Sequence, residues 1–222
     1  MEKITIQSEK IKWFALLAMT FDHIGRIFPD TPLICDTLGR TAFPIFSYLL
    51  ISNFCTYHNA KKYILRLGFF AVLTQIILYR YDFQNILFSF LYAIVFLSFV
   101  ENLCKMTKSF IVQAYFSLLL FLILAPLIIM ADYGLAGFVF LIALYGYLKN
   151  KTKLNYAAVL LTSVIINCSS FIAAFSGFAT TVLLLSFVKI ENSKRLMKWW
   201  FFYVYYPLHR LIIFSLKTFL GI

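Results

Sequence analysis

Long apolar segments separated by short polar loops dominate the sequence and leave few alternatives for its fold. Hydrophobic residues make up 62% of the 222 residues and charged residues only 13%, which is too little polar surface for a water-soluble globule. The apolar segments are 11–28, 40–58, 63–79, 85–101, 110–131, 133–148, 154–169, 171–189 and 199–216. Since a bilayer core takes roughly 20 helical residues, the sequence predicts an all-α, polytopic integral membrane protein with about nine transmembrane helices.

The positions of the basic residues predict how these helices are oriented. Most of the 20 Lys and Arg residues fall at the N-terminus and in every second loop, including Lys61, Lys62 and the group at 149–153. Loops rich in Lys and Arg stay in the cytoplasm, beside membrane lipid. We therefore expect a cytoplasmic N-terminus and a multi-pass protein of the plasma or inner membrane. These loops account for the net charge of +11, so no nucleic-acid partner is expected.

Other recognisable organisation is sparse. The sequence has no internal repeat and no Gly/Ser-rich linker, so we expect residues 1–222 to form a single transmembrane domain. P-loop, Rossmann and α/β-hydrolase motifs do not occur. The three histidines and four cysteines lack the spacing of a metal site, and no metal is expected.

Ionisable residues interrupt the first apolar segment, WFALLAMTFDHIGRIF at 13–28. Such residues are costly at membrane depth and usually face a protein interior or a cavity. Asp22 and Arg26 are four positions apart with the acid first, which favours an ion pair. Asp22 and His23 are about a hundred degrees apart around the helix, so Asp22 is not expected to orient His23. His23 is a candidate general base; the alternative is a structural histidine bonded to another helix.

Further polar residues fall at the same, extracytoplasmic ends of the predicted helices. They are Arg40, Asn85, Tyr133, Tyr206 and His209. Their gathering at one membrane face indicates chemistry at or within that face. For His209 three roles stay open: a second acid or base, a hydrogen-bond donor to a substrate, or a packed residue near the interface.

Six sequence blocks, in order, resemble the TraX family, membrane acetylases of conjugative pilin. The blocks are KWFALLAMTFDHIGRIF (12–28), GRTAFPIF (39–46), KKYILRLGFFAVLTQ (61–75), NILFSF (85–90), DYGLAGF (132–138) and YYPLHRLII (205–213). That family is similar to the integral-membrane acyltransferases, which use acyl-CoA and carry a histidine in the first helix and an arginine before the second. The resemblance implies that His23 is the catalytic histidine and that Arg40 binds the acyl donor or the developing oxyanion. Asp22 is grouped with these two, without an assigned role, and the candidate substrate- or cofactor-binding residues are Arg26, Asn85, Tyr133, Tyr206 and His209.

The resemblance implies acetyl transfer from acetyl-CoA to an acceptor at the extracytoplasmic side, here the N-terminal amine of a pilin subunit. His23 would deprotonate the acceptor, and Arg40 or a neighbouring residue would stabilise the tetrahedral oxyanion. A relayed acetyl group on His23 stays open. Acetyl-CoA is cytoplasmic, so Lys61, Lys62 or the group at 149–153 would hold its phosphates, unless these residues only face lipid. The alternatives are O-acetylation of a cell-surface glycan and, in a different class, transport of a small solute or ion.

Overall fold

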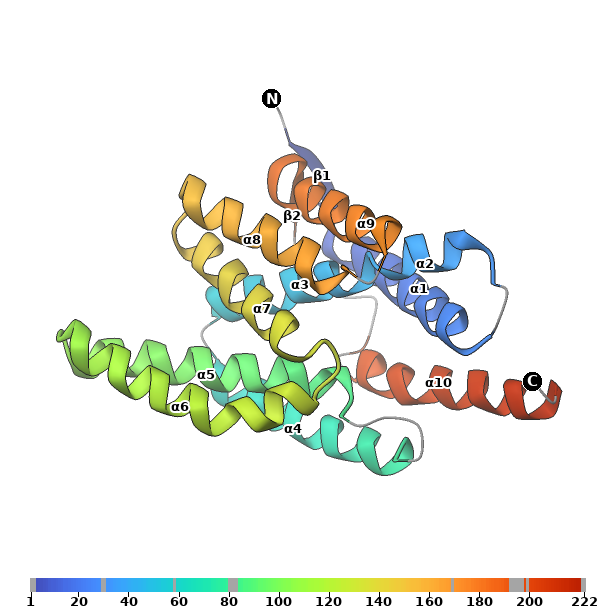
Figure 1. The fold of residues 1–222 in the computed structure, drawn as a ribbon, viewed down its shortest axis with the longest axis horizontal. Helices are drawn as coiled ribbons and strands as arrows, with labels where there is room; N and C mark the ends of the chain where they lie inside the picture. The colour runs from blue at the N-terminus through green and yellow to red at the C-terminus, as the bar shows by residue number, and fades with distance from the viewer. Residues whose placement is uncertain are drawn as a thin grey trace. The chain divides into compact units, whose positions relative to one another are not determined.

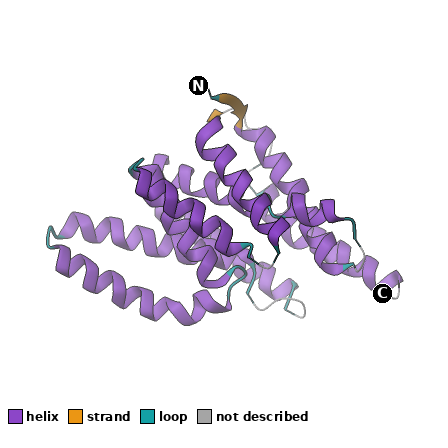
Figure 2. Cartoon of the chain, turned by 45° about the horizontal axis from the view of Figure 1, so that its top comes forward, coloured by secondary structure: helices purple, strands orange, loops and turns teal. Residues whose placement is uncertain are grey.

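The computed structural model describes residues 3–28, 31–57, 59–79, 84–168, 170–191, 198 and 200–220. Within these ranges nearly all regular structure is helical (Figure 2). The helices are α1 (Ser8–Ile27), α2 (Leu33–Gly39), α3 (Ala42–Tyr57), α4 (Ala60–Ile77), α5 (Ile86–Met106), α6 (Phe110–Met130), α7 (Gly134–Lys149), α8 (Lys153–Ile166), α9 (Phe171–Val182), the π-helical segment η1 (Leu183–Phe187) and α10 (Phe201–Leu220). Two short strands, β1 (Ile4–Gln7) and β2 (Val188–Glu191), complete the fold.

Every apolar segment that the sequence predicts as a membrane helix coincides with a helix of the structure, so the all-α prediction is confirmed for the described residues. Two features differ from the prediction. The short helix α2 lies in a segment expected to be a loop, and the segment 171–189 leaves the α-helical path at η1 and ends in β2. No period-2 pattern in this segment is long enough to indicate a strand.

Among the described helices, α5 and α6 are long and apolar enough to span a bilayer by length and composition. The apolar stretch of α6 is only 6% buried, so its side chains face outward on nearly all sides, as on a lipid-exposed helix. The segments α7, α8 and α9–η1 are apolar but shorter. The structure thus has candidate membrane spans, while the count of about nine and their orientation stay predictions.

The chain forms two compact units, which we describe separately. Unit 1 comprises residues 1–50 and 156–222; there α1 packs against α2 and α10, and α2 packs against α9. Unit 2 comprises residues 51–155, and its central helix α5 contacts α4, α6 and α7. Figure 1 shows α5 and α6 lying side by side as a helical hairpin. Because compact units need not fold independently, the single-domain prediction stays a prediction.

Two distant segments meet at one end of unit 1. Strands β1 and β2 pair in parallel, with Ile4 opposite Val188 and Gln7 opposite Glu191. The chain N-terminus and the segment after η1 therefore lie at the same end of the unit. This agrees with the charge pattern, which assigns both segments to the cytoplasmic side.

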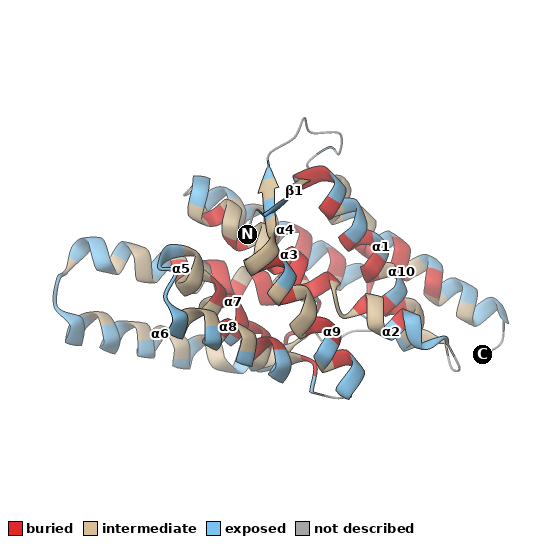
Figure 3. Cartoon of the chain, turned by 90° about the horizontal axis from the view of Figure 1, so that it is seen from above, coloured by how far each residue is buried: buried red, intermediate tan, exposed pale blue. Residues whose placement is uncertain are grey.

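On helix α1 the buried face contains Asp22 and His23 beside apolar residues, whereas the exposed face carries several large apolar side chains. Its buried residues include Ala15, Leu16, Met19, Asp22 and His23, whereas its exposed residues include Trp13, Phe14, Leu17 and Phe21. Helix α10 has the same arrangement, with buried His209 and Arg210 and exposed Leu208 and Ile212. Figure 3 shows both buried and exposed residues along α1 and α10. A helix in water would have the reverse pattern. The arrangement matches that of ionisable residues in membrane helices, which face the protein interior.

Candidate functional site

Most of the predicted site residues lie together in unit 1, where they form a buried polar cluster. We use this name for Asp22, His23 and Arg26 of α1, Arg40 directly after α2, and Tyr206 and His209 of α10. Helices α1 and α10 run in the same direction, since Trp13 contacts Phe201 near one end and His23 contacts His209 further along both helices. The buried faces of the two helices therefore bring polar residues that are far apart in the sequence to one place.

The predicted ion pair on α1 is present. Arg26 Nε lies 2.8 Å from Asp22 Oδ2, with the Asp22 side chain 7% exposed and that of Arg26 36% exposed. The i,i+4 spacing places both side chains on one helix face. The carboxylate of Asp22 is thus engaged by Arg26, and His23 has a different partner, as the helical geometry predicts.

A glycine allows α2 to end directly against α1. A Cβ atom on Gly39 would lie 2.6 Å from Cα of Asp22 and 2.9 Å from its backbone nitrogen, closer than any side-chain atom can approach. This contact places Arg40, the next residue, beside Asp22, with 3.7 Å between Arg40 Nη1 and Asp22 Oδ1. The structure thereby explains the glycine and the arginine of GRTAFPIF together. Gly39 permits the close approach of α2 to α1, and this approach brings Arg40 to Asp22.

The pairing between Asp22 and Arg40 is incomplete. At 3.7 Å the two charges attract but do not form a hydrogen bond. Within the described ranges, Asp22 Oδ1 and Arg40 Nε are buried and have no hydrogen-bond partner. Buried polar atoms without partners are uncommon and costly. These two atoms are an acceptor and a donor that a polar group of a ligand, or a water molecule, would satisfy.

The two histidines of the cluster are bonded to one another. His23 Nδ1 lies 2.6 Å from His209 Nε2, and each residue is 5% exposed. On its other side, His209 Nδ1 lies 2.8 Å from the backbone oxygen of Tyr205. A hydrogen bond between two imidazole nitrogens has one donor and one acceptor, so the pair carries at most one positive charge. Among the described residues, Nε2 of His23 makes no hydrogen bond.

Sequence reasoning assigned no site role to several residues around this pair. Tyr205 stacks on His209, with ring centroids 5.0 Å apart and planes at 13°, and its hydroxyl lies 2.7 Å from Thr20 Oγ1 on α1. Arg210 is buried and donates from Nη1 to the Tyr206 hydroxyl at 3.5 Å. The signal for these residues was their position beside His209 or one helical turn before His23.

The other predicted site residues lie in unit 2. Asn85 caps α5: its Oδ1 accepts from the backbone nitrogen of Leu87 at 3.1 Å, and its Nδ2 donates to Ala71 O at 2.9 Å and to Gln75 Oε1 at 3.1 Å. The side-chain amide therefore ties α4 to the start of α5. This geometry is that of a structural cap, and a binding role for Asn85 stays a prediction.

Tyr133 precedes α7 in a left-handed backbone conformation, with φ of 63°, and Gly134 follows with φ of 48°. For a bulky residue this conformation is strained by roughly 1–3 kcal/mol. The backbone of Asp132 donates to Gln84 O at 2.9 Å, and Ser89 donates to Asp132 O at 2.7 Å. The tight turn at Tyr133 is thus joined to the start of α5, close to Asn85.

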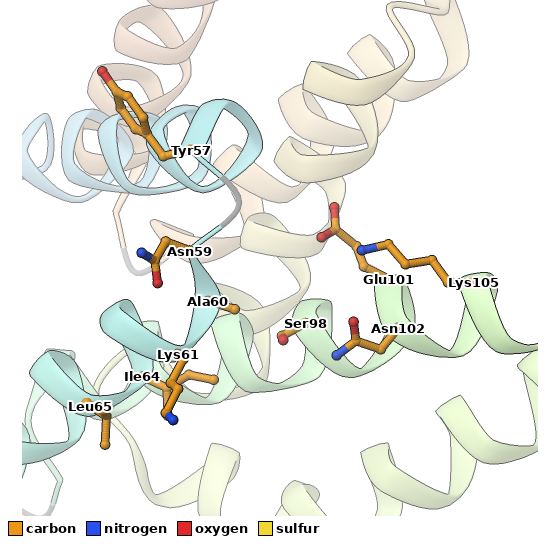
Figure 4. A pocket seen from close by; sticks show the side chains of 10 residues that line it. All are labelled: Tyr57, Asn59, Ala60, Lys61, Ile64, Leu65, Ser98, Glu101, Asn102 and Lys105. Carbon is orange, nitrogen blue, oxygen red and sulfur yellow. The ribbon is translucent and has the colours of Figure 1, made fainter.

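Unit 2 also contains an open pocket of about 540 Å³ (Figure 4), within the usual range for small-molecule sites. Its lining residues are Tyr57, Asn59, Ala60, Lys61, Ile64, Leu65, Ser98, Glu101, Asn102 and Lys105. Lys61 and Lys62 are both exposed, but only Lys61 is among the lining residues. Glu101 is bound by Lys149 at 3.0 Å and by the Tyr145 hydroxyl at 2.5 Å.

A search of the described residues finds no group of three or more His, Cys, Asp or Glu side chains that would hold a metal ion. The buried polar cluster itself supplies an imidazole with a free nitrogen, a carboxylate and guanidinium groups. Such groups suit proton transfer and stabilisation of a developing negative charge.

Comparison with known proteins gives a single consistent answer. The family model described as TraX protein matches residues 7–217. Protein TraX of Escherichia coli is 30% identical over 220 residues, covering 93% of this chain and 86% of that protein. No solved structure matches the chain. The family match spans nearly the whole chain and includes every residue of the buried polar cluster, so the chain belongs to the TraX family.

Proposed function

We propose that this chain is a membrane acetyltransferase that moves the acetyl group of acetyl-CoA to an acceptor at the extracytoplasmic side, namely the N-terminal amine of a pilin subunit. The observation that carries the proposal is His23, a buried imidazole whose Nε2 makes no hydrogen bond among the described residues and whose neighbour in the sequence, Asp22, is approached by the guanidinium groups of Arg26 and Arg40. Membership in the TraX family supports pilin as the acceptor, through the resemblance to pilin acetylases. The exposed apolar residues of α1 and α6 support a site at membrane depth.

In the proposed reaction His23 is the general base. The acceptor nitrogen attacks the acetyl carbonyl carbon and gives its proton to Nε2 of His23. The carbon–sulfur bond then breaks, the carbonyl re-forms, and the CoA thiolate leaves and takes the proton back from His23. General-base catalysis of this kind contributes roughly 10²–10⁴-fold to the rate.

In the proposed reaction Arg40 stabilises the oxyanion of the tetrahedral intermediate. Its Nη1 approaches Asp22 at 3.7 Å without a hydrogen bond, and its Nε is a buried donor with no partner among the described residues. Asp22 holds the guanidinium in position and limits the cost of burying its charge. Transfer through an acetyl group on His23 uses the same atoms, with Nε2 as nucleophile.

We further propose that the phosphates of acetyl-CoA bind in the pocket of unit 2. Lys61 and Lys105 supply two cations, and the pocket wall includes Asn59 and Ala60 at the N-terminus of α4, where the helix dipole favours an anion. Lys149 offsets the negative charge of Glu101. The charge pattern assigns this end of α4 to the cytoplasmic side, where acetyl-CoA is available.

Ligand binding is tested by the thermal stability of the detergent-purified protein, because a ligand that binds only the folded state raises the apparent stability. Acetyl-CoA is compared with desacetyl-CoA and with a nucleotide of equal charge. A shift specific to the CoA compounds is expected. No shift at saturating ligand, in folded protein, would contradict the proposal and favour transport of a solute or ion.

The catalytic assignment is tested by His23→Ala. We expect this variant to fold and to retain the stabilisation by acetyl-CoA, but to lose acetyl transfer. Phe21→Leu is the matched control, since Phe21 is two residues away on the exposed face of α1, and it should transfer acetyl groups at the wild-type rate. Retained transfer in His23→Ala would refute the assignment.

A further inference from the structure

We infer that His209 is a positioning residue that sets the tautomer of His23, so that the proton of neutral His23 is on Nδ1 and the basic lone pair is on Nε2. The inference depends on the proposed function only for its consequence in catalysis. The tautomer itself follows from the hydrogen bonds of the two rings, and it identifies which atom of the buried polar cluster accepts a proton.

The backbone oxygen of Tyr205 lies 2.8 Å from His209 Nδ1. A carbonyl oxygen accepts hydrogen bonds and cannot donate them. His209 Nδ1 must therefore carry the hydrogen of this bond. In a neutral imidazole only one ring nitrogen carries a hydrogen, so Nε2 of neutral His209 is an acceptor.

The hydrogen bond between the two rings then fixes the hydrogen of His23. His23 Nδ1 lies 2.6 Å from His209 Nε2. Since His209 Nε2 is the acceptor, His23 Nδ1 must be the donor. Nε2 of neutral His23 then has no hydrogen and a free lone pair. This is the nitrogen that makes no hydrogen bond among the described residues, and it is thus available to a substrate.

The surroundings of His209 hold the chain of bonds in place. His209 is 5% exposed, so bulk water competes little for its ring nitrogens. Its ring stacks on Tyr205, and the Tyr205 hydroxyl is bonded to Thr20 on α1 at 2.7 Å. This second link between the helices lies one turn before His23 and keeps the two imidazoles in register.

His209 takes the part that a carboxylate has in a Ser-His-Asp triad, where the third residue orients the histidine and selects its tautomer. The carboxylate next to His23 in the sequence, Asp22, is paired with Arg26 at 2.8 Å and approached by Arg40 at 3.7 Å. When His23 takes up a proton at Nε2, its Nδ1 hydrogen still points at His209 Nε2. The positive charge that forms is therefore stabilised by a charge-assisted hydrogen bond.

The direct test is ¹⁵N NMR of the histidine rings in the detergent-solubilised, full-length protein. The chain has three histidines, so single substitutions assign the signals. We expect the hydrogen of neutral His23 on Nδ1 and a nitrogen shift typical of an unprotonated ring at Nε2. A hydrogen on Nε2 of His23 would overturn the inference. Because the measurement needs no acetyl transfer, it can refute the inference about the tautomer without refuting the proposed function.

Two variants of His209 separate positioning from packing. In His209→Gln the amide oxygen can accept the bond from His23 Nδ1, whereas His209→Leu offers no acceptor. We expect the glutamine variant to keep the His23 tautomer and transfer within several-fold of wild type, and the leucine variant to lose the tautomer and about 10²-fold in kcat. An unchanged tautomer in the leucine variant, or equal losses in both, would contradict the inference.

Discussion

Replacing Gly39 by alanine should separate α2 from α1 and thereby disable the buried polar cluster. The new Cβ would lie 2.6 Å from Cα, 2.7 Å from Cβ and 2.9 Å from the backbone nitrogen of Asp22. Two of these atoms belong to the backbone of α1, so no side-chain rotation relieves the overlap. Since carbon atoms pack at about 3.5–4.0 Å, α2 must withdraw by roughly 1 Å.

The withdrawal has two measurable consequences. Overpacking of this kind lowers the free energy of unfolding by about 1–3 kcal/mol. Arg40 moves with α2, so its distance of 3.7 Å from Asp22 grows beyond the range of a salt bridge. A displacement of about 1 Å at a reacting group can cost around 10²-fold in rate. We therefore expect Gly39→Ala to melt at a lower temperature and to transfer acetyl groups about a hundredfold more slowly.

The matched control is Gly146→Ala. A Cβ at Gly146 in α7 would meet no atom within 4 Å, and alanine is the better helix former by about 1 kcal/mol. This variant should be as stable as wild type or slightly more stable, with unchanged transfer. If Gly39→Ala resembled Gly146→Ala in both measurements, the proposed role of the close approach between α2 and Asp22 would be wrong.

Three further predictions test individual contacts. Asp22→Asn should lower the free energy of unfolding by about 2 kcal/mol and thereby lower the melting temperature. The loss should be smaller than for a fully buried ion pair, because Arg26 is 36% exposed. Glu191→Gln, which removes the exposed pair with Lys189, should change stability negligibly, and equal melting of both variants would refute this prediction. Asn85→Ala removes the cap of α5 and should lower the free energy of unfolding by about 1–2 kcal/mol, while each folded molecule keeps its activity. A variant that is stable but inactive would instead place Asn85 in the catalytic site. Lys61→Glu should weaken acetyl-CoA binding about tenfold or more, measured by ligand-induced stabilisation. The neighbouring variant Lys62→Glu, whose residue is outside the pocket wall, should bind acetyl-CoA nearly normally. Equal effects of the two variants would exclude this pocket as the binding site for the phosphates.

The helices were predictable because apolar segments of the required length are separated by short polar loops. Those segments match α1 and α3 to α10 within the described ranges. The short helix α2 was not predictable from hydropathy, because its seven residues include Asp36 and Thr37. The pairing of β1 with β2 joins residues about 180 positions apart in sequence, and local patterns carry no information on contacts at that separation.

The candidate site was predictable in part. The ion pair of Asp22 and Arg26 follows from helical spacing alone. The bond between His23 and His209 depends on how α10 packs against α1, and periodicity indicates which face of a helix is buried but not which helix covers it. The prediction had left His209 with three open roles for this reason.

The remaining candidates show the limits of residue type as a guide. Asn85 was selected because it is polar and near the extracytoplasmic face, yet its side-chain amide is engaged in capping α5. Gly39 was part of a quoted motif, but its function became clear only from its distance to Asp22. A polar residue at a helix end has a structural use in most proteins, so position and type together do not distinguish a cap from a ligand-binding group.

The most direct test of the account is the intact mass of a processed pilin subunit produced together with the wild-type chain or with its His23→Ala variant. The account predicts a mass increase of one acetyl group on the pilin N-terminus with the wild type, and unmodified pilin with the variant, at equal amounts of both membrane proteins. Unmodified pilin with the wild type, or acetylated pilin with His23→Ala, would contradict it.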